Sequence, residues 1–250
     1  MKKVLYTLAC TAALTSSVMA DFTRVEMGAG AWMQTPKGNA TYTDGGADGL
    51  YISSEKENTQ AYVWMLIKHP VPVLPNLRVE YVSIDDDGVA SGQFKDFTIT
   101  SASTSLSYDM KQYDIIPYYN ILDNTAWITL DLGLDIKIID ASYTAAPSAP
   151  FTGYSDSVTF AIPLLYARGR VEIPSTEIGL EADVKYITTG DSTVYDVRAK
   201  VDYTFDFVPA IQPALEVGYR VQKLDIDESS VDAKLDIDFS GFYAGFMLRF

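Results

Sequence analysis

The sequence has few of the residues that most often do chemistry in enzymes. Among 250 residues there is one cysteine, Cys10, and one histidine, His69. A single cysteine excludes an intramolecular disulfide, and a single histidine leaves a hydrolytic triad without an ordinary base elsewhere in the chain. His69 precedes a proline, which favours a turn residue over a catalytic base. We therefore expect a non-enzymatic protein without a cofactor.

Positive charge is also scarce. The chain has 19 Lys and Arg against 33 Asp and Glu, which gives a net charge of −14. Nucleic-acid binding needs clustered basic residues to contact phosphates, so we expect no nucleic-acid partner. The mean hydropathy is only +0.03, although Tyr (17) and Phe (11) are abundant. Near-neutral hydropathy with many aromatics is typical of a membrane barrel, in which alternate residues face lipid.

The one long apolar run lies at the N-terminus. Met1-Lys2-Lys3 is followed by apolar residues to about Leu14 and by Ser17-Val18-Met19-Ala20. A basic start, an apolar centre and a small-residue end predict a secretory signal over 1–20, cleaved after Ala20, and a mature domain over 21–250. The run is too short for a membrane-spanning helix. Cleavage removes Lys2, Lys3 and Cys10 and lowers the net charge from −14 to −16.

Two other interpretations of this segment are weaker. A lipid anchor on Cys10 would need Leu three residues earlier, whereas Leu8 lies two residues before it. A buried helix of a soluble protein would need helical partners, and the rest of the chain does not have helical patterning. We expect export by the cleaved signal.

After Ala20 the dominant pattern has a period of two. In 126–138, for example, Ile128, Leu130 and Leu132 alternate with Thr129 and Asp131. Such alternation predicts strands with one apolar and one polar face. Clean alternation covers 24–33, 126–138, 178–186, 195–203 and 215–221, and weaker alternation covers 59–68, 77–84, 98–119, 157–172 and 238–250.

The connections between these strands alternate between short and long. The short ones are 69–76, 122–124, 173–176 and 205–211, and the longer polar ones are 35–58, 85–96, 143–156, 188–193 and 224–236. Short turns at one end and long loops at the other are typical of bacterial outer-membrane barrels. We predict an all-β fold, an antiparallel up-and-down transmembrane β-barrel of about ten strands. A soluble periplasmic β-protein is the alternative.

One strand changes phase. Leu106, Tyr108 and Met110 share one parity, whereas Tyr113 and Ile115 have the other. A β-bulge near 111–112 would explain this change, and we predict one there.

The polar faces of the strands mix charges of both signs at close spacing. In a membrane barrel these residues face the lumen, where they can form ion pairs between neighbouring strands. Long charged side chains in a narrow barrel predict a largely filled lumen, with a narrow channel for small solutes or ions as the alternative. The lumen candidates are Arg24, Glu26, Arg78, Glu80, Asp135, Lys137, Asp183, Lys185, Arg198, Lys200 and Arg220.

Acidic residues also gather in the expected loops. Asp85, Asp86 and Asp87 are consecutive, and Asp225 and Asp227 lie in a second group. Oxygen ligands in a turn can bind a divalent cation. The spacing matches no calcium motif, so we interpret both groups as solvated loops and as weak metal candidates only.

The last strand alternates apolar residues up to Phe250. This pattern at Phe242, Phe246, Leu248 and Phe250 resembles the C-terminal signature of outer-membrane barrels, which implies recognition by the barrel-assembly machinery.

Three further stretches carry a family resemblance. They are the proline-rich 69–81, the segment 113–124 and Asp131-Leu132-Gly133-Leu134. Together they resemble a Gram-negative outer-membrane β-barrel family of uncharacterised function, over essentially the whole mature chain. The resemblance implies an outer-membrane location among lipid and lipopolysaccharide, and it supplies no catalytic residues. We expect a structural or surface role.

Overall fold

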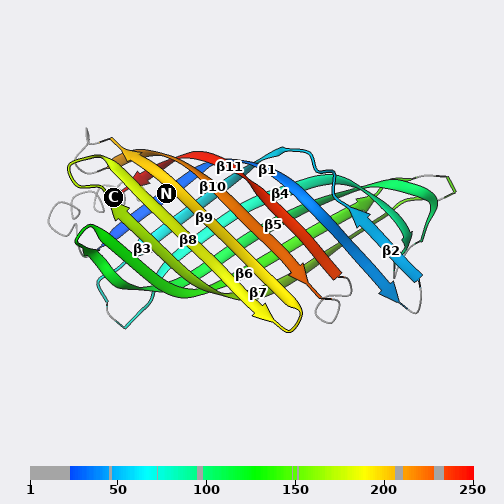
Figure 1. Ribbon diagram of the computed structural model, residues 1–250, viewed down its shortest axis with the longest axis horizontal. Coiled ribbons are helices and arrows are strands. Elements are labelled where there is room, and N and C mark those ends of the chain that lie inside the picture. Colours follow the sequence, from blue (N-terminus) through cyan, green and yellow to red (C-terminus); the bar gives the residue numbers. More distant parts are fainter. Residues whose placement is uncertain are drawn as a thin grey trace, which may run out of the picture.

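In the computed structural model the described residues form one antiparallel sheet that closes into a barrel (Figure 1). The structure describes residues 23–44, 47–71, 73–94, 98–147, 149–150, 152–205, 211–227 and 234–250. None of these segments is a helix long and apolar enough to cross a membrane. The strands are β1 (Arg24–Asp44), β2 (Ala47–Ile52), β3 (Asn58–Lys68), β4 (Asn76–Gln93), β5 (Thr98–Thr125), β6 (Ile128–Ala145), β7 (Tyr154–Glu172), β8 (Ile178–Thr189), β9 (Ser192–Thr204), β10 (Gln212–Ile226) and β11 (Lys234–Arg249).

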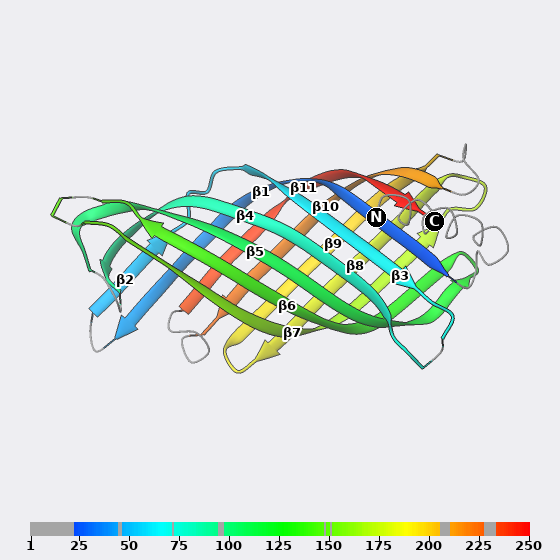
Figure 2. The ribbon, with the colours of Figure 1, turned by 180° about the vertical axis from the view of Figure 1, so that it is seen from behind.

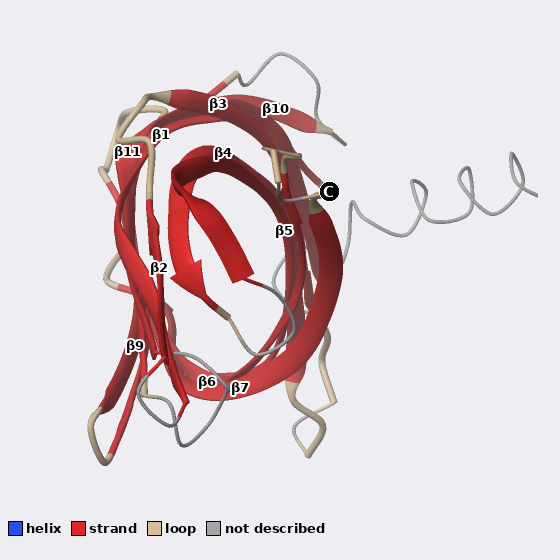
Figure 3. Cartoon of the chain, turned by 90° about the vertical axis from the view of Figure 1, so that its right-hand side faces the viewer, coloured by secondary structure: helices blue, strands red, loops and turns tan. Residues whose placement is uncertain are grey.

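The barrel has ten strand positions. The last strand closes it, because β11 pairs with β1 from Glu26↔Arg249 to Thr41↔Lys234. Two of the eleven strands share one position: β3 and then β2 lie between β1 and β4, separated by residues 53–57. Viewed nearly along its long axis, the sheet encloses its interior (Figure 3). The predicted ten-stranded antiparallel barrel is confirmed.

The strands of the barrel extend to different heights at one of its two ends. We call the end with Arg24 and Arg249 the near end, and the end with Asp44, Gln93 and Gly190 the far end. Toward the far end β4 to β7 form a tall wall, whereas the β8–β9 hairpin stops much lower (Figure 2). The predicted long loops are therefore partly wrong. Region 35–58 holds the end of β1, all of β2 and the start of β3, and region 85–96 is mostly β4.

The strands extend further than predicted because their two faces exchange character along the barrel. On β4, the charged Arg78 and Glu80 point inward close to the end that holds Arg24 and Arg249. The apolar Val82 and Ile84 follow them on the same face. On the outer face, apolar residues give way to Ser83, Asp85 and Asp87. The far half of β4 is thus mainly apolar on its inner face and mainly polar on its outer face, as in a water-soluble barrel.

The β-bulge predicted near 111–112 is absent from the pairing of β5 with its neighbours. The exchange of faces explains the change of phase instead. The register of β4 with β5 is unbroken from Asn76↔Tyr118 to Ala90↔Thr104. The register shifts lie elsewhere, between Ala90 and Gly92 on β4 and between Asn120 and Thr125 on β5. Leu106, Tyr108 and Met110 are buried inside, whereas Tyr113 and Ile115 are 40% exposed outside. The apolar residues change parity because the apolar face changes, while the strand itself stays regular.

In the near half, the outer surface is an apolar belt. Every strand position contributes at least one large apolar side chain that is 37–64% exposed. Apolar side chains around the whole circumference match what a membrane barrel presents to lipid. Examples from successive positions are Met27, Val63, Leu77, Ile115, Leu134, Leu165, Val184, Val197, Val217 and Phe246.

Candidate functional site

The centre of the barrel is a network of ion pairs. Lys185 on β8 reaches across the interior, and its Nζ lies 2.6 Å from Glu80 Oε2 on β4 and 2.9 Å from Asp114 Oδ2 on β5. Lys137 Nζ lies 2.6 Å from Asp114 Oδ1 and 3.4 Å from Asp196 Oδ2. Strands on opposite sides of the barrel are thereby joined through charged side chains that are almost fully buried.

Arginines extend the network around the wall. Arg198 Nη2 lies 2.5 Å from Glu80 Oε1 and 2.8 Å from Asp183 Oδ1. Arg220 Nη2 lies 2.6 Å from Asp196 Oδ2. Such charge-assisted pairs are the strong class of hydrogen bond, and they offset the large desolvation cost of charges away from water.

A second layer lies closer to the near end. Arg168 contacts Asp131 at 2.6 Å and Glu181 at 2.7 Å. Arg170 and Arg249 both bind Asp202, at 2.6 and 2.8 Å. These residues lie on the inward faces of β6, β7, β8, β9 and β11. On β7 the period of two places Arg168 and Arg170 on the same face, one above the other.

All eleven predicted lumen residues lie inside the barrel or at its rim. Ten of them are at most 8% exposed, and Arg24 lies at the rim, where its side chain is 31% exposed and contacts Glu26 at 2.6 Å. The sequence-based prediction of lumen residues did not include other members of the network. Arg168 and Arg170 lie in a region of weak alternation, and the predicted bulge next to Asp114 obscured which face it occupies. A strict count of parity from Tyr118 backwards would have placed Asp114 inside.

Aromatic rings fill the space beside the charges. Trp64 lies between Arg78 and Lys200, whose cationic groups are 5.1 and 4.7 Å from its ring centroid. Its Nε1 donates to Glu216 Oε1 at 3.1 Å. A Cβ on the inward-facing Gly28 would lie 2.5 Å from that same nitrogen. The lumen glycines therefore accommodate large side chains, and they do not outline an open path.

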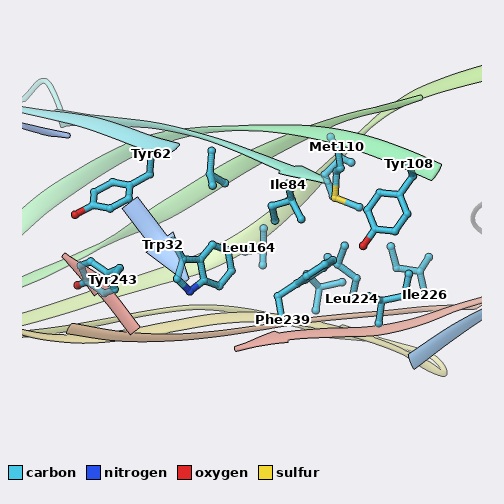
Figure 4. Close-up of a cluster of buried hydrophobic side chains, with 14 of the residues drawn as sticks. Trp32, Tyr62, Ile84, Tyr108, Met110, Leu164, Leu224, Ile226, Phe239 and Tyr243 are labelled. Carbon is cyan, nitrogen blue, oxygen red and sulfur yellow. The ribbon is translucent and has the colours of Figure 1, made fainter. Parts of the chain in front are cut away.

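Toward the far end, buried apolar side chains lie inside the barrel. We define the plug as Ile84, Met110, Ile139, Leu164, Leu224 and Phe239, all of which are at most 6% exposed (Figure 4). Below it, Gln222 Nε2 on β10 donates to Gln112 Oε1 on β5 at 2.8 Å, across the lumen. A hollow beside Trp32, Tyr62 and Glu80 measures about 20 Å³, which is room for about one water molecule.

One buried carboxylate stands apart from the pairs. Asp135 on β6 is fully buried and faces Leu164 on β7. Neither of its oxygens has a hydrogen-bond partner among the described residues. A buried carboxylate without a hydrogen-bond partner is costly to keep ionised.

The acidic groups proposed as weak metal candidates do not form a ligand set. Asp85, Asp86 and Asp87 are consecutive residues of a strand, so they alternate between its faces and do not converge. The backbone N–H of Asp227 donates to Ser192 Oγ at 2.9 Å. Asp225 lies 3.9 Å from Lys223 Nζ. Within the described ranges, no three His, Cys, Asp or Glu side chains are placed to hold a metal ion.

Asp86 has a structural contact in the far half. Its Oδ2 accepts hydrogen bonds from Tyr51 Oη at 2.7 Å and from the backbone N–H of Ser54 at 3.0 Å. Asp86 thus holds the break between β2 and β3 against β4. Burial, together with the hydrogen bond to Asp86, raises the pKa of Tyr51 well above its ordinary value. Burial likewise raises the pKa of Tyr108.

His69 lies in the near-end turn between β3 and β4. Its backbone N–H donates to Asn76 Oδ1 at 3.0 Å, and its Nδ1 accepts from the N–H of Val71 at 3.2 Å. Its Nε2 lies 3.0 Å from the carbonyl oxygen of Pro75. These contacts occupy both ring nitrogens with the backbone of its own turn.

The chain-end predictions have different outcomes. The signal segment 1–20 and the cleavage position Ala20 lie outside the described residues. Phe242, Phe246 and Phe250 point outward, with exposed fractions of 62, 46 and 42%. Leu248 shares their face on β11, the strand that closes the barrel against β1.

Comparison with known proteins shows the fold alone. No family model and no curated protein matches this chain. The solved structure of the outer membrane protease OmpT from Escherichia coli matches with a TM-score of 0.53 at 11% identity, over 91% of this chain and 96% of that one. The translocator domain of the autotransporter NalP from Neisseria meningitidis matches with a TM-score of 0.46 at 12% identity, over 100% and 96%. The chain shares with OmpT the closed antiparallel barrel fold of an outer-membrane protein.

Proposed function

We propose that the protein is an outer-membrane β-barrel with a closed, non-conducting interior and a structural or surface role. It belongs to a barrel family of uncharacterised function, and it reaches the membrane by a cleaved signal and the barrel-assembly machinery. The apolar belt supports the membrane location, because its side chains would otherwise face water around the whole circumference. Its partners are outer-membrane lipid and lipopolysaccharide, and it is not an enzyme.

The closed interior carries the proposal. Ions crossing the barrel would have to pass a paired charge network and then a plug of buried apolar side chains. A conducting pore needs a continuous hydrated path, and interior side chains of small barrels commonly fill that path. The cross-lumen bond between Gln112 and Gln222 separates the two layers.

Planar-bilayer recording tests this proposal. We expect the refolded wild-type protein to give no reproducible unit conductance under conditions where a general porin does. The double variant Leu224→Ala with Phe239→Ala should also stay silent, because the ion-pair layer beneath the plug still closes the lumen. Val217→Ala on the lipid-facing surface is the matched control.

Reproducible unit steps in the wild-type protein would overturn the closed barrel and favour a narrow channel for small solutes or ions. Steps that appear only in the plug variant would show that the plug is the whole barrier and that the charge layer conducts.

A further inference from the structure

The tall wall ends in a strand with one free edge. β7 pairs with β6 along its whole length, from Ile128↔Val171 to Ala145↔Tyr154. Its pairing with β8 covers only Leu165↔Tyr186 to Glu172↔Gly179. In the described part of the chain no strand pairs with Ser155–Leu164 on that second side. Figures 1 and 2 show β7 continuing past the low β8–β9 hairpin as the border of the wall.

The odd-numbered residues direct their backbone groups to this free side. In an antiparallel strand, alternate residues direct N–H and C=O to opposite neighbours. The N–H of Glu172, an even position, donates to the carbonyl of Trp127 on the β6 side. The N–H of Ser157, an odd position, is bonded to its neighbouring Asp156 side chain at 2.8 Å and not to β6. Pro163 is also odd, and proline is tolerated in a strand where no ladder donor is required.

Among the described residues, no strand pairs with the outward backbone groups of Ser155, Thr159 and Ala161 along the free edge. Unpaired strand edges bind another extended chain by adding it to the sheet. Natural barrels protect such edges from pairing. Here Pro163, which lacks an N–H, gives such protection only at the end of the edge closest to the membrane. The exposed fractions agree, because Ser155–Thr159 are exposed on both faces of the strand.

The side chains around the edge indicate which residue types an added strand would carry. On the inner face of β7, Ile162 and Phe160 follow the plug residue Leu164, which favours apolar residues on one face of an added strand. The surroundings hold Asp140, Asp156 and Asp191, and no Lys or Arg occurs in 154–167 or 186–197. Charge complementarity therefore favours a basic or hydroxyl-bearing outer face on the partner.

A second copy of this chain fits the edge poorly. Two barrels inserted in the same direction both have β7 running from the far end toward the membrane, so their β7 edges cannot pair antiparallel. A segment of a different polypeptide can approach in either direction.

We propose that the free edge of β7, Ser155–Pro163, docks an extended segment of a partner polypeptide that alternates apolar with basic or hydroxyl residues, by β-strand addition. The outward position of this edge rests on the proposed function, whereas the binding itself does not. Binding to purified barrel in detergent can therefore fail or succeed independently of membrane location.

The test is fluorescence anisotropy with a labelled probe peptide of about nine residues that alternates Val with Lys and Thr. We expect saturable binding to the wild-type barrel. Ala161→Pro removes one edge donor without touching the β6 ladder and should weaken binding about fivefold or more. Ala161→Val keeps the donor and should bind as the wild type does.

A second arm uses only the wild-type protein, so misfolding of a variant cannot mislead. The same peptide with alternate backbone amides methylated cannot complete the ladder, and it should bind at least about fivefold more weakly. No saturable binding of the unmodified peptide would overturn the proposal. Equal binding of both peptides, or of the Pro and Val variants, would do so as well, because side-chain attraction alone would then explain the binding. A dimer cross-linked through Ser157→Cys, with no peptide binding, would assign the edge to a second copy instead.

Discussion

At the residue scale, the interior of this barrel depends on matched charges. Lys185 binds two carboxylates from the neighbouring strands β4 and β5, across the barrel from β8. Each carboxylate has another cationic neighbour, Arg198 for Glu80 and Lys137 for Asp114. Buried pairs contribute little relative to an apolar core, but loss of one member leaves its partner charged and desolvated. Removal of a paired residue should therefore lower the free energy of unfolding, whereas removal of an unpaired residue should leave it unchanged or raise it.

Lys185→Met should strongly destabilise the barrel. It removes the cation shared by Glu80 and Asp114 and leaves two buried carboxylates short of a partner. Breaking one buried pair costs about 3–5 kcal/mol of unfolding free energy. Urea unfolding in detergent, followed by tryptophan fluorescence, measures this change.

Asp135→Asn is the contrasting variant in the same layer. Asp135 has no hydrogen-bond partner among the described residues, so its loss leaves no group unpaired. We expect the unfolding free energy to stay the same or to rise. A loss as large as that of Lys185→Met would mean that Asp135 is paired in the folded protein.

At the element scale, the strands are continuous although their surroundings change. β4 begins between a charged lumen and the apolar belt, and it ends between an apolar interior and a polar exterior. The same change occurs on β5, where Asp114 and Met110 both point inward. Strands keep their register through the change because backbone hydrogen bonds do not depend on which face is apolar. The break between β2 and β3 is instead held by side chains, through Asp86.

Raising the pH above 10 should loosen this break. The pKa of Tyr51 is raised above its ordinary value of 10.0 by burial and by Asp86. The folded state therefore favours the neutral phenol, and this contribution is fully present below pH 10 and is lost as the pH rises beyond it. Hydrogen exchange of segment 49–60, corrected for intrinsic rates between about pH 8 and about pH 11, should show accelerating exchange.

Tyr51→Phe provides the control for this pH effect, because phenylalanine does not ionise. Its exchange in segment 49–60 should be faster at neutral pH, since the hydrogen bond to Asp86 is lost, and should depend less on pH. An equally steep rise in the variant would assign the alkaline transition to another group.

At the scale of the whole molecule, the sheet closes on itself. β11 and β1 pair over sixteen residue positions, from Glu26↔Arg249 to Thr41↔Lys234, so no free edge is left in the membrane-facing half at this seam. A closed sheet has no strand from which unfolding can begin by simple fraying. The interior adds cross-lumen pairs such as Lys185 with Glu80.

The folded barrel should therefore resist SDS until it is heated. In washed outer membranes we expect the unboiled protein to migrate faster on a cold SDS gel than the boiled protein, because the closed barrel stays compact. Recovery in the periplasmic extract, with no difference in migration, would contradict the membrane location and favour a soluble β-protein.

The sequence by itself determined the fold class. Alternation with a period of two reports directly which residues share a face, so ten strand positions and most of the inward charges followed from residues such as those of 178–186 and 195–203. Strand ends near 85–96 and the supposed bulge at 111–112 could not be assigned, because sequence patterning assumes that one face stays apolar throughout.

Only the tertiary structure decided what the inward faces meet. Ion pairs between β4 and β8, and the bond between Gln112 and Gln222, join residues more than 100 positions apart. Their geometry depends on barrel closure and strand tilt, which local alternation does not encode. The free edge of β7 likewise follows from the unequal heights of neighbouring strands, a property of the assembled sheet and not of any one segment.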